Sequence, residues 1–180
     1  NFYILKEYGA YNAYTISILT VPSFFMMAIS SSLVPEISKL YLNKEVKLIK
    51  KRLKQSIIYA LIIGVIYMII LFLFDSKLLN ILYKTSDGLS YIRILNPIFP
   101  LFYLESIFSS FILATNKAIN SMIITIIGII VKLLSLSIFC ILKLGMYSLV
   151  YSEIINIIIV IILDIYIVRR IISTITFHCS

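Results

Sequence analysis

Several residues of this 180-residue sequence place charged or amide groups within otherwise apolar stretches, and those that could form a site are Arg93, Glu105, Lys132, Glu153 and Asn156. An ionised side chain at the centre of a bilayer costs about 2.5–3.5 kcal/mol even on lenient scales, so such groups face a cavity or one another. We expect Lys132 and Arg93 to supply positive charge to an anionic group. The acids would then control the pairing and protonation of Lys132. These residue types therefore predict a polar cavity that receives an anionic group.

Helical spacing brings several of these groups onto shared faces, because positions three and four residues apart lie on one side of a helix. One row consists of Thr125, Gly128, Lys132 and Ser135, and a second of Glu153, Asn156, Val160 and Asp164. A turn near 142–143 places Lys132 and Glu153 at similar depth, so we expect that they can pair. Glu105 is offset from Lys132 by about 6 Å along the axis, which a lysine stem can span.

The alternative is that these charges only lock the helices together. For Asp164 we expect a carboxylate that reaches toward Arg169 and Arg170 and takes no part in a site. A row of small residues on the third apolar stretch is typical of close helix packing, and it consists of Ser106, Ser110 and Ala114.

Motifs for an enzyme, a metal site or a cofactor do not occur in the sequence. The sole histidine, His178, stands beside Cys179 in the last residues, and the other cysteine, Cys140, lies within an apolar run. This spacing matches neither a disulfide framework nor a set of metal ligands. We therefore predict no enzymatic activity, no metal and no cofactor.

The elements that must position the polar groups are membrane spans. Hydrophobic residues make up 61% of the sequence and charged residues 13%, whereas a soluble domain is about 45–50% apolar. This composition excludes a soluble globular domain and a disordered chain. Stretches long enough to cross about 30 Å of hydrocarbon are 11–35, 57–74, 91–115, 119–141 and 147–168. We predict an all-α integral membrane protein with about five transmembrane helices over 1–172 and a tail at 173–180.

The basic residues indicate the orientation of these spans. Ten of the sixteen Lys and Arg residues fall in the connection 36–56, in the turn 115–117 and at Arg169 and Arg170. Cytoplasmic loops of membrane proteins are rich in Lys and Arg, so we predict that these segments are cytoplasmic and that the N-terminus lies outside.

The connection 36–56 concentrates positive charge at Lys39, Lys44, Lys47, Lys50, Lys51, Arg52 and Lys54. We expect it to lie as an amphipathic helix on the anionic lipids of the inner leaflet. Because membrane spans flank this segment, we do not expect nucleic-acid binding.

A series of short motifs resembles one transporter family. They are YGAYN at 8–12, LTVP at 19–22, LVPEIS at 33–38, IRIL at 92–95, ILATNK at 112–117, GIIVK at 128–132 and GMYS at 145–148. In order and spacing they resemble polysaccharide-biosynthesis transporters, the stage V sporulation protein B-like branch of the MOP flippase superfamily, which is related to lipid II flippases and MATE exporters. Two positions depart from the family pattern, where Asn116 replaces a common Gly and Ser148 a small Gly or Ala.

The resemblance implies two six-helix lobes that face each other across a central cavity and alternate between inward-open and outward-open states. The chain would supply the second to sixth helices of the second lobe, and its missing partners would be the first lobe and the opening helix of the second. Family members move lipid-linked saccharides across the cytoplasmic membrane. We therefore expect part of a bacterial flippase or exporter for a lipid-linked precursor of a cell-wall, spore-cortex or surface glycan. Arg93 and Lys132 would attract its head group, and Glu105, Glu153 and Asn156 would line the cavity.

Three other functions remain as alternatives. A cation-coupled antiporter of small molecules would need a membrane-embedded acid free of a basic partner, and the nearness of Lys132 to Glu105 and Glu153 argues against it. A membrane glycosyltransferase would need acidic or histidine residues on long external loops, whereas the connections expected outside carry only Asp75 and Asp87. A non-transporting scaffold is compatible with the odd number of spans.

Labelling of single cysteines in the intact protein tests the orientation. With Cys140 and Cys179 replaced by serine, a Lys47→Cys variant should react with an impermeant maleimide only from the cytoplasm. The matched control is Thr85→Cys, in a connection expected outside, which should react only from the exterior. Labelling of Lys47→Cys from the exterior would overturn the predicted topology.

Overall fold

The computed structural model describes residues 2–85 and 87–177, which lie in helices and the short turns between them. The elements are α1 (Phe2–Gly9), the π-helical η1 (Ala10–Ile16), α2 (Ser17–Leu19), α3 (Ser23–Leu42), α4 (Val46–Tyr83), α5 (Leu89–Leu95), α6 (Phe99–Ala114), α7 (Ala118–Ile141) and α8 (Tyr147–Phe177). The predicted all-α fold is confirmed. His178 and Cys179 lie outside the described residues.

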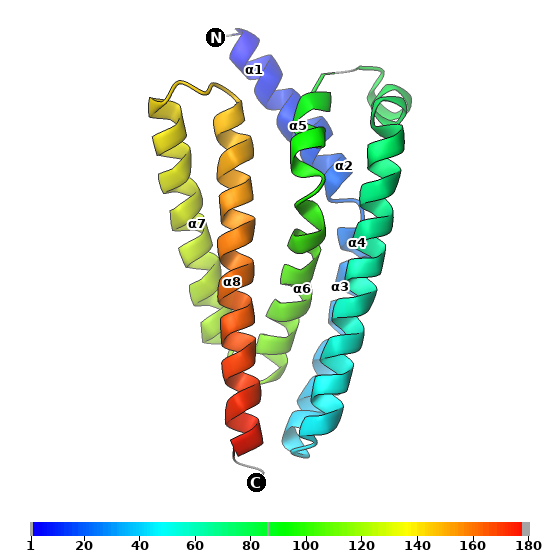
Figure 1. The fold of residues 1–180 in the computed structure, drawn as a ribbon, viewed down its shortest axis with the longest axis vertical. Helices are drawn as coiled ribbons and strands as arrows, with labels where there is room; N and C mark the ends of the chain where they lie inside the picture. Colours follow the sequence, from blue (N-terminus) through cyan, green and yellow to red (C-terminus); the bar gives the residue numbers. More distant parts are fainter. Residues whose placement is uncertain (1, 86, 178–180) are drawn as a thin grey trace.

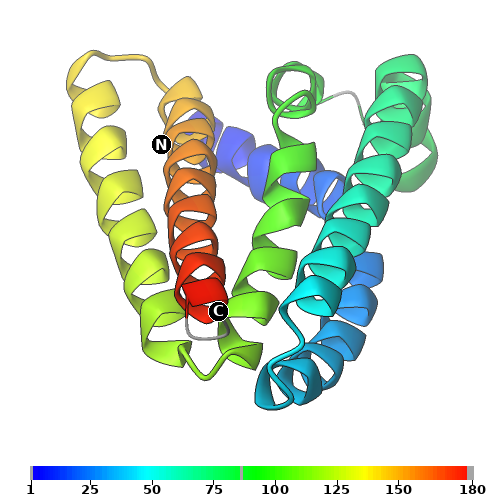
Figure 2. The same ribbon diagram turned by 60° about the horizontal axis from the view of Figure 1, so that its bottom comes forward.

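The helices form a bundle around α6 (Figure 1). α6 packs against α3, α4, α7 and α8, and α7 and α8 form an antiparallel hairpin. Figure 2 shows α3 and α4 on one side of α6 and the hairpin on the other. We call the end of the bundle that carries α1, the α4–α5 turn and the α7–α8 turn the α1 end, and the opposite end the C-terminal end.

Two of the expected spans are bent. Lys6–Leu19 and Ser23–Leu42 meet at 51°, and Leu89–Leu95 and Phe99–Ala114 meet at 58°. The breaks contain Pro22 and Pro97, which have no backbone N–H for the helical ladder. Both bends therefore fall inside the stretches 11–35 and 91–115 that hydropathy predicts as single spans.

Side-chain hydrogen bonds tie both breaks to neighbouring helices. Tyr103 Oη donates to the Leu19 carbonyl at 2.5 Å, and Tyr67 Oη donates to the Ile18 carbonyl at 2.7 Å. At the second break Asn96 is itself the donor, and its Nδ2 binds the Met68 carbonyl of α4 at 3.0 Å. Because lipid offers no hydrogen-bond partner, a broken span needs such partners from within the protein.

The helices differ in extent from the segments that hydropathy predicts. α3 runs to Leu42 and α4 begins at Val46, so the basic segment 36–56 is helical apart from 43–45 and is not a loop. α4 contains no proline, and Gly64 is its one glycine. The helix is therefore continuous, and it extends beyond the expected span 57–74. Similarly, α8 continues to Phe177, so the described part of the expected tail 173–180 is helical.

The apolar surface of the bundle suits a membrane. By length and composition α4 and α7 can each cross a bilayer, and each bent pair also qualifies as one span. Within the described ranges α8 does not meet the same criteria, so the fifth span at 147–168 stays a prediction.

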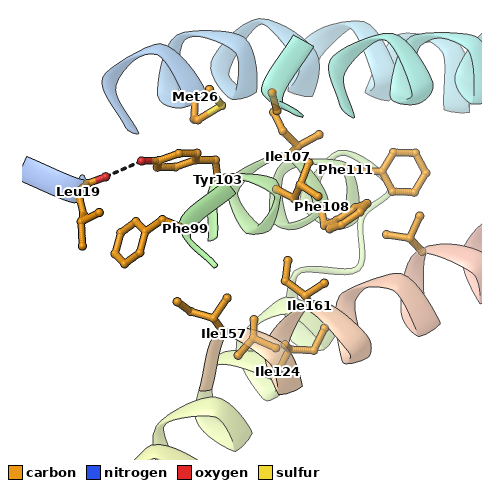
Figure 3. Packing of buried hydrophobic residues seen from close by; sticks show 14 of the residues in the cluster. Leu19, Met26, Phe99, Tyr103, Ile107, Phe108, Phe111, Ile124, Ile157 and Ile161 are labelled. Carbon is orange, nitrogen blue, oxygen red and sulfur yellow. Dashed lines mark hydrogen bonds between the residues drawn. The ribbon is translucent and has the colours of Figure 1, made fainter. Parts of the chain in front are cut away.

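The core gathers on α6. Tyr103, Ile107 and Phe111 of this helix are fully buried. Figure 3 shows Tyr103 reaching toward Leu19, with Met26 of α3 on one side of α6 and Ile157 and Ile161 of α8 on the other. The row of small residues on α6 faces α3. Ser30 Oγ lies 2.7 Å from Ser106 Oγ, and Ser38 Oγ donates to the Ala114 carbonyl at 3.0 Å. The row therefore packs closely against a neighbouring helix, as its spacing predicts.

Replacement of Tyr103 by phenylalanine tests the support of the first break. The Tyr103→Phe variant leaves the Leu19 carbonyl buried without this donor, which should lower the free energy of unfolding by about 1–3 kcal/mol. The matched control is Tyr59→Phe, at an exposed tyrosine of α4, which should change it by about 0.5 kcal/mol or less. Thermal unfolding of the intact protein in detergent measures both, and equal stability of the two variants would contradict the assigned role.

Candidate functional site

Lys132 and Glu153 form the ionic centre of the candidate site. Lys132 Nζ of α7 contacts Glu153 Oε2 of α8, and the side chains are 39% and 13% exposed. The pairing expected from their equal distance to the α7–α8 turn is therefore present. Because each charge neutralises the other, both side chains can lie in a partly buried position where a single unpaired charge would cost several kcal/mol.

The antiparallel packing of α7 and α8 brings the two polar rows together. Gly128 lies one turn from Lys132, and Asn156 lies one turn from Glu153. A Cβ atom at Gly128 would lie only 2.8 Å from Asn156 Oδ1 and 2.6 Å from Val160 Cγ2. Glycine at position 128 therefore allows the close approach of the helices at which the rows meet.

The ion pair opens onto a hollow of about 270 Å³ whose lining combines aromatic and polar groups. Besides Lys132 and Glu153, its walls include Tyr8, Tyr11 and Asn12 from α1 and η1. Hydropathy and charge spacing did not predict these three residues as part of the site. The available signal was the YGAYN motif itself, which sets two tyrosines and an amide within five positions.

A chain of tyrosines continues from this hollow across the α1 end. The rings of Tyr11 and Tyr91 meet edge to face with centroids 6.1 Å apart, and those of Tyr91 and Tyr147 with centroids 5.3 Å apart. Edge-to-face aromatic pairs stabilise their mutual orientation. They join η1, α5 and α8, and so fix the first segment of the chain against the site.

Glu105 lies apart from Lys132, in a second hollow. This hollow measures about 200 Å³, and α3 and α6 contribute most of its lining, including Ser23, Met26 and Ser106. Among the described residues Glu105 forms no ion pair with Lys132, whose partner is Glu153. The structure therefore does not bring Glu105 into the predicted contact with lysine.

Asp164 contradicts its prediction. Its side chain is 1% exposed, and among the described residues neither carboxylate oxygen has a hydrogen-bond partner. Arg169 and Arg170 are exposed and do not pair with it. The physical reason is helical geometry, because at 100° per residue Asp164 shares the core-facing side of α8 with Val160 and Val168, and the two arginines point away.

Arg93 belongs to a different ion pair. Its Nε lies 2.6 Å from Asp75 Oδ2, and Asp75 Oδ1 accepts the backbone N–H of Ser76 at 2.6 Å. Arg93 lines a hollow together with α4, separate from that of Lys132. The expected grouping of Arg93 with Lys132 is thus absent, and sequence reasoning missed Asp75 because it placed this residue in a loop.

Metal-ligating residues do not cluster in the part of the chain that the structure describes: no group of three or more His, Cys, Asp or Glu suited to an ion occurs there.

Comparison with known proteins places this arrangement in a family. The MatE family model matches residues 9–138, which extend from α1 into α7. The chain belongs to the MatE family. The matched range includes Arg93, Glu105 and Lys132, and it ends before Glu153 and Asn156. The membrane-embedded helices and this family make the chain part of a multi-pass membrane protein of the MOP superfamily.

Two curated relatives, both from Bacillus subtilis (strain 168), are similar to this MatE chain. Stage V sporulation protein B is 32% identical over 127 residues, which are 71% of this chain and 24% of the relative. Sporulation protein YkvU is 28% identical over 100 residues, which are 56% of this chain and 22% of the relative. The aligned chain spans about a quarter of the length of these relatives. No solved structure matches the chain significantly.

A double-mutant cycle tests the ion pair. The single changes Lys132→Met and Glu153→Gln, compared with their combination, should give a coupling energy of about 1–3 kcal/mol because the pair is partly buried. The control cycle uses Arg52 and Glu36, which lie 2.6 Å apart on the surface and should couple by less than about 1 kcal/mol. Both cycles are measured by unfolding of the intact protein in detergent, and equal coupling in the two would contradict the assignment.

Proposed function

We propose that the protein carrying this chain is a membrane flippase or exporter that moves a lipid-linked saccharide precursor by alternating access. The observation that carries the proposal is the ion pair of Lys132 with Glu153 in a hollow with tyrosine and asparagine walls. A diphosphate-bearing head group needs a cation, and the sugar behind it suits rings with an apolar face and a polar tip. Sequence similarity to stage V sporulation protein B supports the transporter class.

In this proposal Glu153 holds Lys132 while the hollow is empty. An arriving phosphate competes for the ammonium group, so the charge of Lys132 is compensated in both states and never stands alone in a low-dielectric region. Asn12 lines the hollow and offers an amide group for the saccharide. Asn156 lies against Gly128 between α7 and α8 and is not among the lining residues of this hollow. Arg93 lies in a separate hollow and contributes nothing to this exchange.

The chain acts together with segments beyond it in this proposal. Its helices serve as the second to sixth of the second lobe, and the first lobe closes the pathway from the other side. The transported group crosses unchanged, so the protein performs no enzymatic reaction.

The positively charged C-terminal end supports the proposed orientation, with this end cytoplasmic and the first residue of the chain outside. All seven basic residues expected to contact lipid are exposed there, and they are Lys39, Lys44, Lys47, Lys50, Lys51, Arg52 and Lys54. An exposed basic surface attracts anionic lipids of the inner leaflet.

A cation-coupled exporter of small molecules is the second candidate, and Asp164 favours it. This carboxylate is buried without a hydrogen-bond partner among the described residues. The objection drawn from sequence, that Lys132 lies near Glu105 and Glu153, therefore does not apply to Asp164. Coupled transport would use Asp164 as the carrier of a proton or cation.

Complementation separates these candidates. In a strain lacking its own flippase, Lys132→Ala should abolish rescue by the intact protein, because the head group loses its cation, while membrane abundance stays normal. Glu153→Gln should retain rescue because it leaves Lys132 available. The charge control is Lys143→Asn, in the exposed α7–α8 turn, where asparagine tolerates the positive φ of 56°.

Full rescue by Lys132→Ala would contradict the assignment of Lys132 to the transport site. Proton- or sodium-dependent export of small molecules, lost in Asp164→Asn and kept in Lys132→Ala, would establish the second candidate in its place.

A further inference from the structure

The ion pair of Arg93 with Asp75 marks the end of the apolar surface of α4 nearest the α1 end. Below it, residues 57–74 contain no charged side chain, and beyond it lies Lys77. At 1.5 Å per residue the uncharged run is about 27 Å long, close to the thickness of a hydrocarbon core. The pair therefore lies at the depth at which acyl chains give way to phosphate groups.

An apolar groove leads away from this pair along α4. Its volume is about 370 Å³, and Met68, Ile69, Phe72 and Leu73 line it on α4. The break between α5 and α6 forms the other wall, where Pro97 lies beside the groove. Ile69, Phe72 and Leu73 are exposed, so in a bilayer this wall contacts acyl chains.

Asp75 binds Arg93 through Nε and leaves the terminal nitrogens of the guanidinium available. Asp75, which is only 6% exposed, binds Nε, while the arginine side chain is 61% exposed. Within the described residues no acceptor binds the terminal nitrogens, Nη1 and Nη2. A guanidinium so placed offers a planar pair of donors for phosphate oxygens.

The charge around the groove favours an anion. The carboxylate of Asp75 compensates one positive charge of Arg93, and Lys77 adds a second positive charge one helical turn from Leu73. Lys77 Nζ lies 5.7 Å from the centroid of the Phe74 ring, and neither residue is part of the groove lining. Arg93 is therefore the cation that lines the groove, and Lys77 adds positive charge on the neighbouring turn of α4.

We infer that this groove binds an anionic phospholipid of the phosphatidylglycerol type, with its phosphate on Arg93 and one acyl chain along α4. The nearby charge of Lys77 favours an anionic lipid. The site is separate from the Lys132 hollow and does not depend on the transported substrate. The lipid would contact α4 on one side and the broken α5–α6 span on the other, and would thereby link them at the break.

Native mass spectrometry of the intact protein, titrated in detergent with phosphatidylglycerol and phosphatidylcholine, tests the site. The wild type should retain phosphatidylglycerol preferentially. Arg93→Lys keeps an ion pair with Asp75 but loses the planar donors, so phosphatidylglycerol should bind about tenfold more weakly. Leu73→Trp, which fills the groove without changing charge, should weaken binding to a similar degree.

The controls separate this site from the transport site and from general charge. Lys143→Asn removes a positive charge at the same end of the bundle, and Lys132→Ala removes the cation of the transport site; both should bind phosphatidylglycerol as the wild type does. Equal binding by all variants, or equal retention of the two lipids by the wild type, would overturn the inference. Tighter binding of a polyprenyl diphosphate than of phosphatidylglycerol at this groove would also overturn it.

Discussion

A bilayer offers no hydrogen bonds and little stabilisation of charge, and the arrangement of this protein follows from that constraint. Each break in a span is hydrogen-bonded to another helix: Tyr103 Oη donates to the Leu19 carbonyl at the first break, and Asn96 of the second donates to the Met68 carbonyl of α4. Charged side chains near the membrane also have partners within the protein: Lys132 pairs with Glu153, and Arg93 pairs with Asp75. The polar contacts therefore determine which helices are neighbours and at what depth, while apolar contacts fill the space between them.

The exception to this rule is informative. Asp164 is buried in the core, and neither of its carboxylate oxygens has a hydrogen-bond partner among the described residues. An uncompensated carboxylate is expensive in such a position. The paired Glu153 near the start of α8 and the unpaired Asp164 near its middle therefore differ in chemical character.

Much of this arrangement could be predicted from local sequence. Pro22 and Pro97 predict the bends, and the equal distances of Lys132 and Glu153 from the α7–α8 turn predict their pairing. Asp75 was missed because nothing in the sequence marks where a helix leaves the bilayer and continues in water, so the predicted span stopped at 74 while α4 runs to Tyr83. The place of Tyr8 and Tyr11 beside Lys132 depends on how α1 and η1 cross the bundle, which no local pattern contains.

The affinity of the purified intact protein for a polyprenyl-diphosphate-linked saccharide tests most directly whether the Lys132 hollow receives the transported head group. Binding to the wild type and to Lys132→Ala is compared in the same detergent. If Lys132 supplies the cation for the diphosphate, the dissociation constant of the variant should rise at least about tenfold, equivalent to about 1.4 kcal/mol. An unchanged dissociation constant would contradict this role for Lys132 and return the ion pair to a purely structural one.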